Sequence, residues 1–455
     1  MSFHSFNFIL SLPFFVLSFW LLPKAFQKGW LLVLSLVVYW AAGPADFLLL
    51  LWVVFLNWAS QVNGFQPRRV AGVMVALNLA MLVWFKYRLF LGDMAGFSVA
   101  RDLIIPLGIS FYIFQLIAYQ VEVARGQISG RQSFWEVLLY IFFFPHHQAG
   151  PIMRPRSFLI CFHKARNFYR SRFLTGLMIF AWGLFKKVWI ADVVAPWVNR
   201  DFGKFHLWSG AKGNLLLLGV LFGIQVYGDF SGYSDMAVGM GRMFGFKFDR
   251  NFHQPYLSKN PSEFWKRWHV TLTNWMRDFV YFPMWNWASR HLGHRFKPGA
   301  IMLGCSLVLM LVTGLWHGAG WHFILWGGLH GLIFIAWRLL PSLQNRSFKL
   351  ISFFLFQTVI GLTWVVFREA DIQAIGRAFL RSSAWDGQDS LLALGLLLAL
   401  ILFSRAEEWL ERRFVRLTVW AMHLPMPLFA TAYGSMLIFI FIGAGSATTF
   451  IYQRF

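Results

Sequence analysis

The stretch that decides the fold is residues 311–331, LVTGLWHGAGWHFILWGGLHG. His317 lies there inside a long run of otherwise apolar residues. An ionisable side chain at membrane depth is costly, so a functional role is its default interpretation. Three glycines surround it, Gly314, Gly318 and Gly320. Glycine weakens a helix and lets backbone or ligand approach closely, so we expect the helix to be interrupted here beside a buried cavity. His317 is then either the reactive centre or a histidine that a neighbouring helix satisfies.

The composition of the whole chain indicates an all-α polytopic membrane protein. Of 455 residues, 58% are hydrophobic and only 13% are charged, which is too apolar for a water-soluble domain. The 24 Trp and 52 Phe suit aromatic belts at the membrane interface and packing between membrane helices. No internal repeat, low-complexity tract or long linker occurs, so residues 1–455 are predicted to form a single domain.

The net charge of +22 bears on the choice of partners. In a soluble protein it would suggest nucleic acid, but here the bases fall mostly between apolar segments. We therefore expect no nucleic acid partner, and expect anionic membrane lipids or the phosphates of a cytoplasmic donor instead. One segment has six bases and no acid: Arg154, Arg156, Lys164, Arg166, Arg170 and Arg172. Either lipid headgroups or a specific phosphate would suit it.

Apolar segments recur along the chain at lengths that cross a membrane with some tilt or thinning. They cover residues 8–22, 30–42, 47–59, 70–85, 103–119, 134–144, 173–190, 215–226, 301–315, 322–340, 353–367, 391–403 and 427–442. This predicts roughly a dozen spans, several of them short enough to be re-entrant. The first lacks a cleavage motif and is expected to be retained. Lys24 and Arg68 follow spans one and three, which places the N-terminus outside the cytoplasm. Residues 368–390 and 404–417 are predicted surface elements, the latter amphipathic.

A second histidine lies in residues 260–282, NPSEFWKRWHVTLTNWMRDFVYF. Asn260 can cap a helix and Glu263 can complete a capping box, so a helix is predicted to begin here. Glu263 can also pair with Arg267 one turn on. An apolar face at helical spacing is formed by Trp265, Trp268, Leu272 and Trp275. His269 lies to one side of it, and the residues alone favour an interfacial helix with an aromatic anchor.

Polar side chains interrupt two further apolar stretches. Residues 225–246 hold three charged groups, Asp229, Asp235 and Arg242. Carboxylates there need partners, so structural ion pairing is expected. Residues 143–158 hold a polar triplet, His146, His147 and Gln148, directly after a proline. This predicts a bent entry into the membrane core, with the histidines hydrogen-bonded rather than bound to metal.

Several kinds of site lack their sequence signature. Cys161 and Cys305 provide neither a disulfide framework nor zinc spacing, so no metal is expected. Neither a GxxxxGK[ST] loop nor a strand-borne GxGxxG occurs, and GxSxG is absent as well. These absences count against a nucleotide-binding enzyme and against the usual serine hydrolase.

Six blocks in order resemble the membrane-bound O-acyltransferases, especially the bacterial alginate O-acetylase type, from about residue 105 to residue 367. The blocks are IPLGISFYIF (105–114), FFP with AGPIMR (143–154), GLFKKVWIAD (183–192), DFSGYSDMAVGMGRMFGF (229–246), SEFWKRWHVTLTNWMRDFVY (262–281) and GLWHGAGWHFILWGGLHG (314–331). The chain departs from the family where a YxPLGGNR segment is common, because residues 280–295 read VYFPMWNWASRHLGHR. That stretch, a predicted loop or short helix near the site, bears on the acceptor polymer or partner protein.

The resemblance implies a fold and two site residues. The fold is a set of membrane helices with a central two-sided funnel and a thin partition where acyl groups cross. The family's invariant histidine matches His317, and the histidine of its FW-x-RWH motif matches His269. The implied activity is O-acetylation of an exported polysaccharide, alginate-like or cellulose-like, in the bacterial cytoplasmic (inner) membrane. The acceptor is the polymer or a periplasmic acetyl-carrier or transferase protein on the outer side.

The chemistry can also be argued from the residues. A hydroxyl can attack a thioester carbonyl if a base takes its proton, and imidazole, with a reference pKa of about 6.5, is suited to this at neutral pH. Burial would keep His317 neutral and able to accept that proton. His269 could donate to the oxyanion or orient the acceptor. The donor is expected to be acetyl-CoA or another acyl thioester on the cytoplasmic side, used as a substrate, with no permanently bound cofactor.

Two alternatives remain open from the sequence. Members of the same family transfer D-alanine or other acyl groups to cell-wall polymers, so the acyl group and the glycan are not fixed by the motifs. A transporter or channel whose buried histidines and aspartates relay protons fits the composition equally well.

Overall fold

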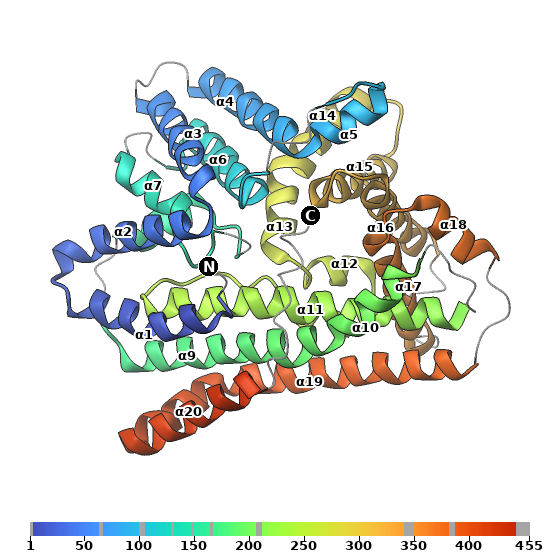
Figure 1. Cartoon of the computed structure of the whole chain (residues 1–455). Helices are drawn as coiled ribbons and strands as arrows, with labels where there is room; N and C mark the ends of the chain where they lie inside the picture. The colour runs from blue at the N-terminus through green and yellow to red at the C-terminus, as the bar shows by residue number, and fades with distance from the viewer. Residues whose placement is uncertain are drawn as a thin grey trace. The chain divides into compact units, whose positions relative to one another are not determined.

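The computed structural model describes residues 3–62, 67–99, 105–128, 132–147, 150–163, 167–205, 212–340, 349–381 and 387–442. All regular secondary structure in these ranges is helical (Figure 1). Eight helices are long and apolar enough to span a membrane, and two shorter apolar helices cover Asn7–Leu21 and Ile109–Ala124. The prediction of an all-α polytopic membrane protein is therefore confirmed. The two-sided funnel stays a prediction.

The helices follow one another with short connections. The first nine are α1 (Phe6–Leu21), α2 (Lys24–Ala42), α3 (Pro44–Val62), α4 (Pro67–Leu82), α5 (Arg88–Ala95), α6 (Ile109–Ala124), α7 (Phe134–Phe142), α8 (Pro155–His163) and α9 (Arg170–Phe185). They are followed by α10 (Asp192–Gly203), α11 (Lys212–Met243), α12 (Pro261–Trp265), α13 (Val270–Met276), α14 (Phe282–Leu292), α15 (Pro298–His317), α16 (Trp321–Leu339), α17 (Lys349–Arg368), α18 (Ile372–Arg381), α19 (Gly387–His423) and α20 (Met426–Ile442). π-Helical turns join three pairs of them: η1 (Val83–Tyr87), η2 (Lys186–Ala191) and η5 (Arg277–Tyr281).

The chain divides into two compact units, each built from separate segments. The first comprises Met1–Leu184, Tyr233–Arg250 and Val415–Thr431. The second comprises Phe185–Gly232, Asn251–Phe414 and Ala432–Phe455. Both candidate histidines, His269 and His317, belong to the second unit. The prediction of a single domain over residues 1–455 stays a prediction.

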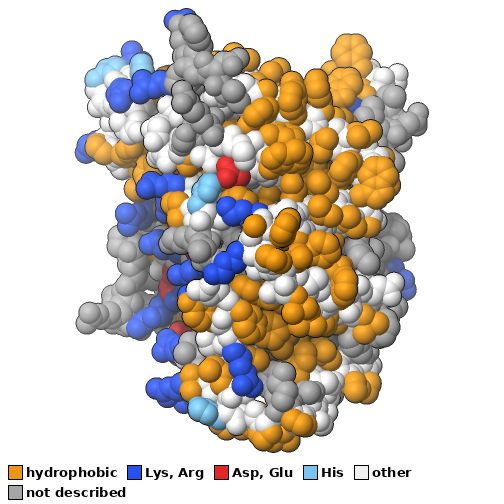
Figure 2. Space-filling view, turned by 90° about the vertical axis from the view of Figure 1, so that its left-hand side faces the viewer, with side chains coloured by type: hydrophobic (Ala, Val, Ile, Leu, Met, Phe, Trp, Pro, Cys, Tyr) orange, Lys and Arg blue, Asp and Glu red, His pale blue; other side chains and the backbone are white. Residues whose placement is uncertain are grey.

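The helices differ in how much of their surface the protein itself covers. The span Asn214–Met243 is 83% buried, whereas Lys24–Ala42 and Pro298–His317 are each 33% buried. Hydrophobic side chains accordingly dominate the face seen in Figure 2. Apolar side chains left uncovered by protein on long apolar helices are those that lipid covers.

Two sequence-based predictions need correction or refinement. The expected span over residues 134–144 is the nine-residue helix α7, which is too short to cross a bilayer. The predicted surface segment 404–417 continues α19 without a break, and only part of it faces outward. Glu408 pairs there with Arg405 and Arg412 near the surface, whereas Glu407 is 1% exposed. The buried carboxylate has a buried lysine as its partner, as described below.

Candidate active site

The predicted interruption at His317 is present in the structure. Helix α15 ends at His317, and α16 begins at Trp321 after Gly320 as its N-cap. Gly318 is fully extended, with φ −170° and ψ 160°, so the chain turns away from the helical path at once. The imidazole is 3% exposed and lies at the end of a helix rather than in its middle. The local weakening by glycine thus produces a helix end at this depth.

Glycine contacts hold α15 and α16 together in this hairpin. A methyl group on Gly314 would overlap the carbonyl oxygen of Phe323, and one on Gly327 would overlap that of Met310. Only glycine permits the two backbones to approach this closely, as small residues do between membrane helices. The position of His317 is therefore set by main-chain contact between the two helices.

Aromatic rings surround the His317 side chain. Its ring centroid lies 5.0 Å from that of Trp316, 5.2 Å from that of Trp326 and 5.2 Å from that of Phe367. The interplanar angles are between 73° and 90°, so the rings meet edge to face. Aromatic walls of this kind exclude water from the space that they line.

The segment that contains His269 folds differently from the continuous helix that the sequence predicts. Asn260 caps α12 as expected, with its Oδ1 accepting from the Glu263 N–H at 2.8 Å, and Glu263 pairs with Arg267 at 2.9 Å. However, α12 ends after five residues, and α13 begins only after His269. The aromatic residues are not an interfacial anchor either, because Trp268 is 1% exposed.

Hydrogen bonds from residues 251–253 explain why the helix breaks. The His253 N–H donates to the Arg267 carbonyl at 3.0 Å, and the Val270 N–H donates to the Asn251 carbonyl at 2.9 Å. These bonds take backbone groups on both sides of His269 that a continuous helix would use. The Asn251 Oδ1 also accepts from the Thr271 N–H at 3.3 Å and from its hydroxyl at 2.5 Å.

His269 itself adopts a left-handed backbone conformation, with φ 44° and ψ 53°. Among the described residues other than glycine, only Gln254 shares a positive φ. Such conformations cost free energy and tend to cluster at functional sites. The His269 ring is fully buried, and burial lowers its pKa to about 3, so it is neutral at physiological pH.

One indole brings the two candidate histidines together. The Trp316 ring lies 5.8 Å from that of His269 and 5.0 Å from that of His317. The His269 ring also contacts the Phe230 ring of α11, with a centroid distance of 4.6 Å. The site therefore places two buried imidazoles, each at a helix end, on one aromatic cluster within the second unit.

A buried charge network lies in the same unit, and sequence reasoning captured only part of it. Its members are Lys186, Lys187, Asp192, Asp229, Glu407 and the hydroxyl of Tyr227. Lys187 Nζ lies 2.8 Å from Asp192 Oδ1 and 2.7 Å from Asp229 Oδ1. Lys186 Nζ lies 2.8 Å from Glu407 Oε1, and the Tyr227 hydroxyl donates to Glu407 as well. The expected ion pairing of Asp229 is thus confirmed.

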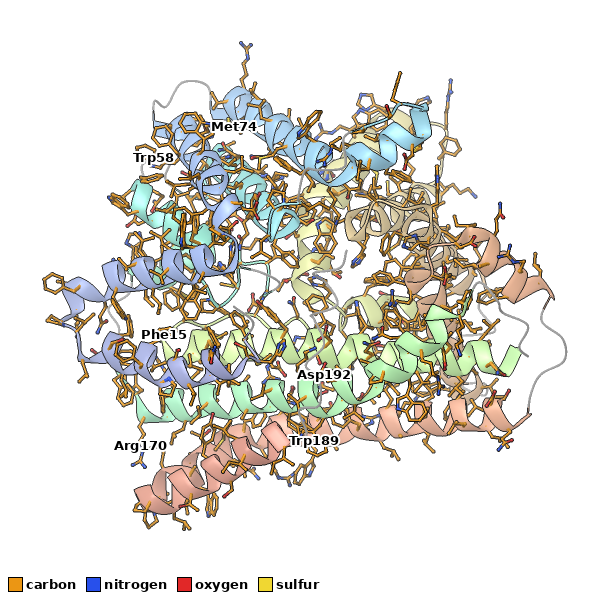
Figure 3. The ribbon with its side chains drawn as sticks, viewed as in Figure 1. Phe15, Trp58, Met74, Arg170, Trp189 and Asp192 are labelled. Atoms are coloured by element: carbon orange, nitrogen blue, oxygen red, sulfur yellow. The ribbon has the colours of Figure 1, made fainter. Side chains whose placement is uncertain are left out.

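The two lysines come from η2, and Asp192, labelled in Figure 3, is the first residue of α10; the other members come from α11 and α19. The available signal was the pair of lysines inside an apolar helix, which predicts nearby carboxylates. The network adjoins the histidine segment, since the Tyr227 ring lies 6.4 Å from that of Trp268. Sequence reasoning also missed His330, whose ring lies 4.6 Å from Trp326 and whose Nε2 lies 3.2 Å from the Thr363 hydroxyl.

Other predicted polar residues belong to the first unit. The His146 Nε2 lies 2.9 Å from the Tyr140 carbonyl oxygen, and the His147 Nδ1 lies 3.2 Å from that of Ile141. Both are hydrogen-bonded, as predicted. Asp235 and Arg242 also lie in that unit. Gln148, Lys164 and Arg166 fall outside the described residues.

Comparisons with known proteins bear directly on the family. The model of the membrane-bound O-acyltransferase family matches residues 34–368. The chain is 34% identical over 392 residues to the probable alginate O-acetylase AlgI of Pseudomonas aeruginosa, covering 81% of this chain and 72% of that protein. It is 31% identical over 407 residues to the peptidoglycan O-acetyltransferase of Helicobacter pylori, covering 80% and 75%.

A more distant relative acts on another polymer. The chain is 28% identical over 251 residues to the teichoic acid D-alanyltransferase of Bacillus subtilis, covering 55% of this chain and 62% of that protein. All three relatives are acyl-transferring enzymes by name, which counts against the transporter alternative. The chain belongs to the membrane-bound O-acyltransferase family and is a multi-pass membrane O-acyltransferase.

Proposed function

We propose that this enzyme moves an acetyl group from a cytoplasmic thioester toward the outer face of the bacterial inner membrane, for O-acetylation of an exported alginate-like or cellulose-like polysaccharide. The donor substrate is acetyl-CoA or another acyl thioester, with no permanently bound cofactor and no metal. Similarity to a probable alginate O-acetylase and to a peptidoglycan O-acetyltransferase, at 34% and 31% identity, supports acetyl as the acyl group.

The observation that carries the proposal is the buried imidazole of His317 at a helix end. The His317 side chain is 3% exposed and is walled by aromatic rings. A neutral imidazole can accept a proton from a hydroxyl that enters the site. We assign His317 as the general base.

The reaction then needs no further co-reactant. The acceptor hydroxyl oxygen bonds to the thioester carbonyl carbon as its proton passes to His317. When the tetrahedral intermediate collapses, the carbon–sulfur bond breaks and the thiol leaves with the proton from the imidazolium. His269, held in its left-handed conformation beside Trp316, orients the acceptor or donates a hydrogen bond to the intermediate.

The partners follow from the two sides of this transfer. The acyl donor binds from the cytoplasm, and the polysaccharide or a periplasmic acetyl-carrier or transferase protein receives the acetyl group outside. Membrane lipids surround the apolar helices, and no nucleic acid takes part. The segment that departs from the family pattern forms helix α14, Phe282–Leu292, with exposed Phe282 and Trp287, and we assign acceptor selection to it.

A second candidate activity is D-alanyl transfer to a cell-wall polymer. The similarity to the teichoic acid D-alanyltransferase of Bacillus subtilis favours it, but that match covers 55% of this chain against 81% for the alginate O-acetylase. The two activities differ in the donor, acetyl-CoA or a D-alanyl thioester of a carrier protein.

The test uses the full chain in proteoliposomes. With labelled acetyl-CoA added to one side and a defined glycan to the other, wild-type protein should transfer label to glycan hydroxyls, and His317→Ala should not. His147→Ala is the matched control, since it also removes a buried imidazole but lies in the first unit. Transfer of D-alanine but not of acetyl would support the second activity. Normal transfer by His317→Ala would refute the assignment of the base.

A further inference from the structure

We infer that the indole N–H of Trp326 is a catalytic group that donates a hydrogen bond to the carbonyl oxygen of the acyl group as that oxygen becomes negatively charged. This inference rests on the proposed function, because it assigns one more role at the same site. It also frees His269 to act on the acceptor rather than on the oxyanion.

The first observation is a buried donor without an acceptor. Trp326 is 0% exposed, and its Nε1 has no hydrogen-bond partner among the described residues. A buried Trp side chain usually finds an acceptor for its N–H, because leaving this group unpaired costs folding free energy. A donor left unpaired in this way calls for an explanation, and one explanation is a ligand that arrives during the reaction.

The second observation is where this donor lies. Trp326 and His317 are perpendicular, with ring centroids 5.2 Å apart. Phe367 completes a triangle, 5.2 Å from His317 and 5.1 Å from Trp326. The unpaired N–H therefore belongs to the ring that borders the general base, and the third ring of the triangle offers no polar group of its own.

The position of Trp326 is also fixed on its remaining sides. His330 lies 4.6 Å from it, Trp265 lies 5.9 Å away and Trp364 stacks on it at 5.9 Å with an interplanar angle of 29°. The first turns of α16 carry the ring, and the glycine contact at Gly327 fixes the backbone directly after it. Such a donor needs no reorganisation when charge develops, which is the property that makes oxyanion donors effective.

The step balances without another reactant. As the acceptor hydroxyl attacks, its oxygen bonds to the carbonyl carbon, its proton goes to His317, and the carbonyl π electrons move onto the acyl oxygen. The Trp326 N–H donates to that oxygen and keeps its own proton. When the carbonyl reforms, the carbon–sulfur bond breaks, the sulfur leaves with the electron pair, and the imidazolium returns the proton to it.

The experiment compares two Trp→Phe substitutions in the same aromatic stack. Trp326→Phe removes the N–H of the ring that contacts His317, and Trp364→Phe removes the N–H of a buried indole that has no ring contact with His317. In the proteoliposome assay, Trp326→Phe should lower kcat about 100-fold or more with the KM for acetyl-CoA within twofold. Trp364→Phe should keep kcat within about threefold, with a similar thermal midpoint for both variants.

A second variant guards against misfolding. β-(3-Benzothienyl)alanine at position 326 replaces the N–H by sulfur and keeps the bicyclic shape, and it should reproduce the loss of kcat. Equal losses in Trp326→Phe and Trp364→Phe, or full activity of the benzothienyl variant, would overturn the inference. Active Trp326→Phe with inactive His317→Ala would refute this inference alone, whereas activity of His317→Ala would refute the proposed function itself.

Discussion

Two pairs of buried histidines, one in each unit, differ in their backbone rather than in the aromatic rings around them. His146 and His147, in the first unit, each place a ring nitrogen next to a backbone carbonyl, at 2.9 and 3.2 Å. His269 and His317, in the second unit, share a contact with Trp316, and aromatic rings also lie against His146 and His147. The exposed fractions, between 0% and 4%, do not separate the pairs. Burial alone is thus a poor guide to a reactive histidine.

The backbone separates the two pairs more clearly. His317 is the last residue of α15 before an extended glycine, and His269 is a left-handed residue between two short helices. His146 and His147 follow α7 in an ordinary turn without positive φ. One pair lies in a turn, with its ring nitrogens next to carbonyls of the preceding helix α7, whereas the other pair stands at helix ends.

The strongest test of the difference between the two pairs makes the same substitution in both of them. Glutamine keeps a polar side chain but cannot act as a base. His317→Gln should lower kcat about 1000-fold, within the range that general-base catalysis supplies. His147→Gln should keep kcat per folded molecule within about threefold. Initial rates of acetyl transfer, normalised to folded protein by size-exclusion chromatography, provide the measurement, and equal losses would mean that the comparison is wrong.

Asparagine at position 269 should have the next largest effect. Asn tolerates a left-handed backbone, so His269→Asn removes the imidazole and keeps the φ of 44°. We expect kcat to fall about 100-fold with little change in thermal midpoint. The matched control is Gln254→Asn, because Gln254 is buried and has a φ of 46°. A loss of activity in that control equal to the loss in His269→Asn would show that backbone strain, not the imidazole, matters.

Loss of the hydrogen bonds that surround His269 should have a smaller effect. Asn251→Ala removes the acceptor for the Thr271 N–H and hydroxyl, so the segment after His269 loses part of its anchor. We expect kcat to fall about tenfold while the KM for the donor stays constant. Asn260→Ala, which removes the α12 cap at a typical cost of about 1 kcal/mol, is the control of similar chemistry. It should leave kcat within twofold at temperatures where both variants stay folded.

Acid should destabilise the folded protein through the low pKa values of His146 and His147. Burial lowers the pKa of His146 to about 3 and that of His147 to about 4. The unfolded chain then binds protons below about pH 6.5 that the folded chain does not, so stability falls as pH falls. Between pH 7 and 5.5 each histidine should cost about 1 kcal/mol. His147→Gln should show a shallower decline in thermal midpoint over that range, and an identical decline would contradict the low pKa.

Much of the fold could be predicted from the sequence because it depends on local composition. The apolar runs predicted the membrane helices. The glycines predicted the helix end at His317, and Asn260 predicted the start of α12. The family motifs likewise identified His317 and His269 as candidates, whose roles stay predictions.

What could not be predicted depends on contacts between distant residues. The spacing of Trp265, Trp268 and Leu272 fits a helix, yet hydrogen bonds from residues 251–253 break it. No local pattern contains that competition. The pairing of Lys186 with Glu407 spans 221 positions, so a segment predicted to lie at the surface proved to have one buried carboxylate. Long-range polar pairing overrides local periodicity at both places.

The backbone contact at Gly314 and Gly327 has a consequence for variation. Because the corner at residue 317 is held by main chain against main chain, side chains on the outer surfaces of both helices can be exchanged without displacing the imidazole. A pair of helices held together in this way tolerates amino-acid substitutions at the positions that face lipid. It allows the corner that carries His317 to be kept while the outer surfaces of the two helices diversify.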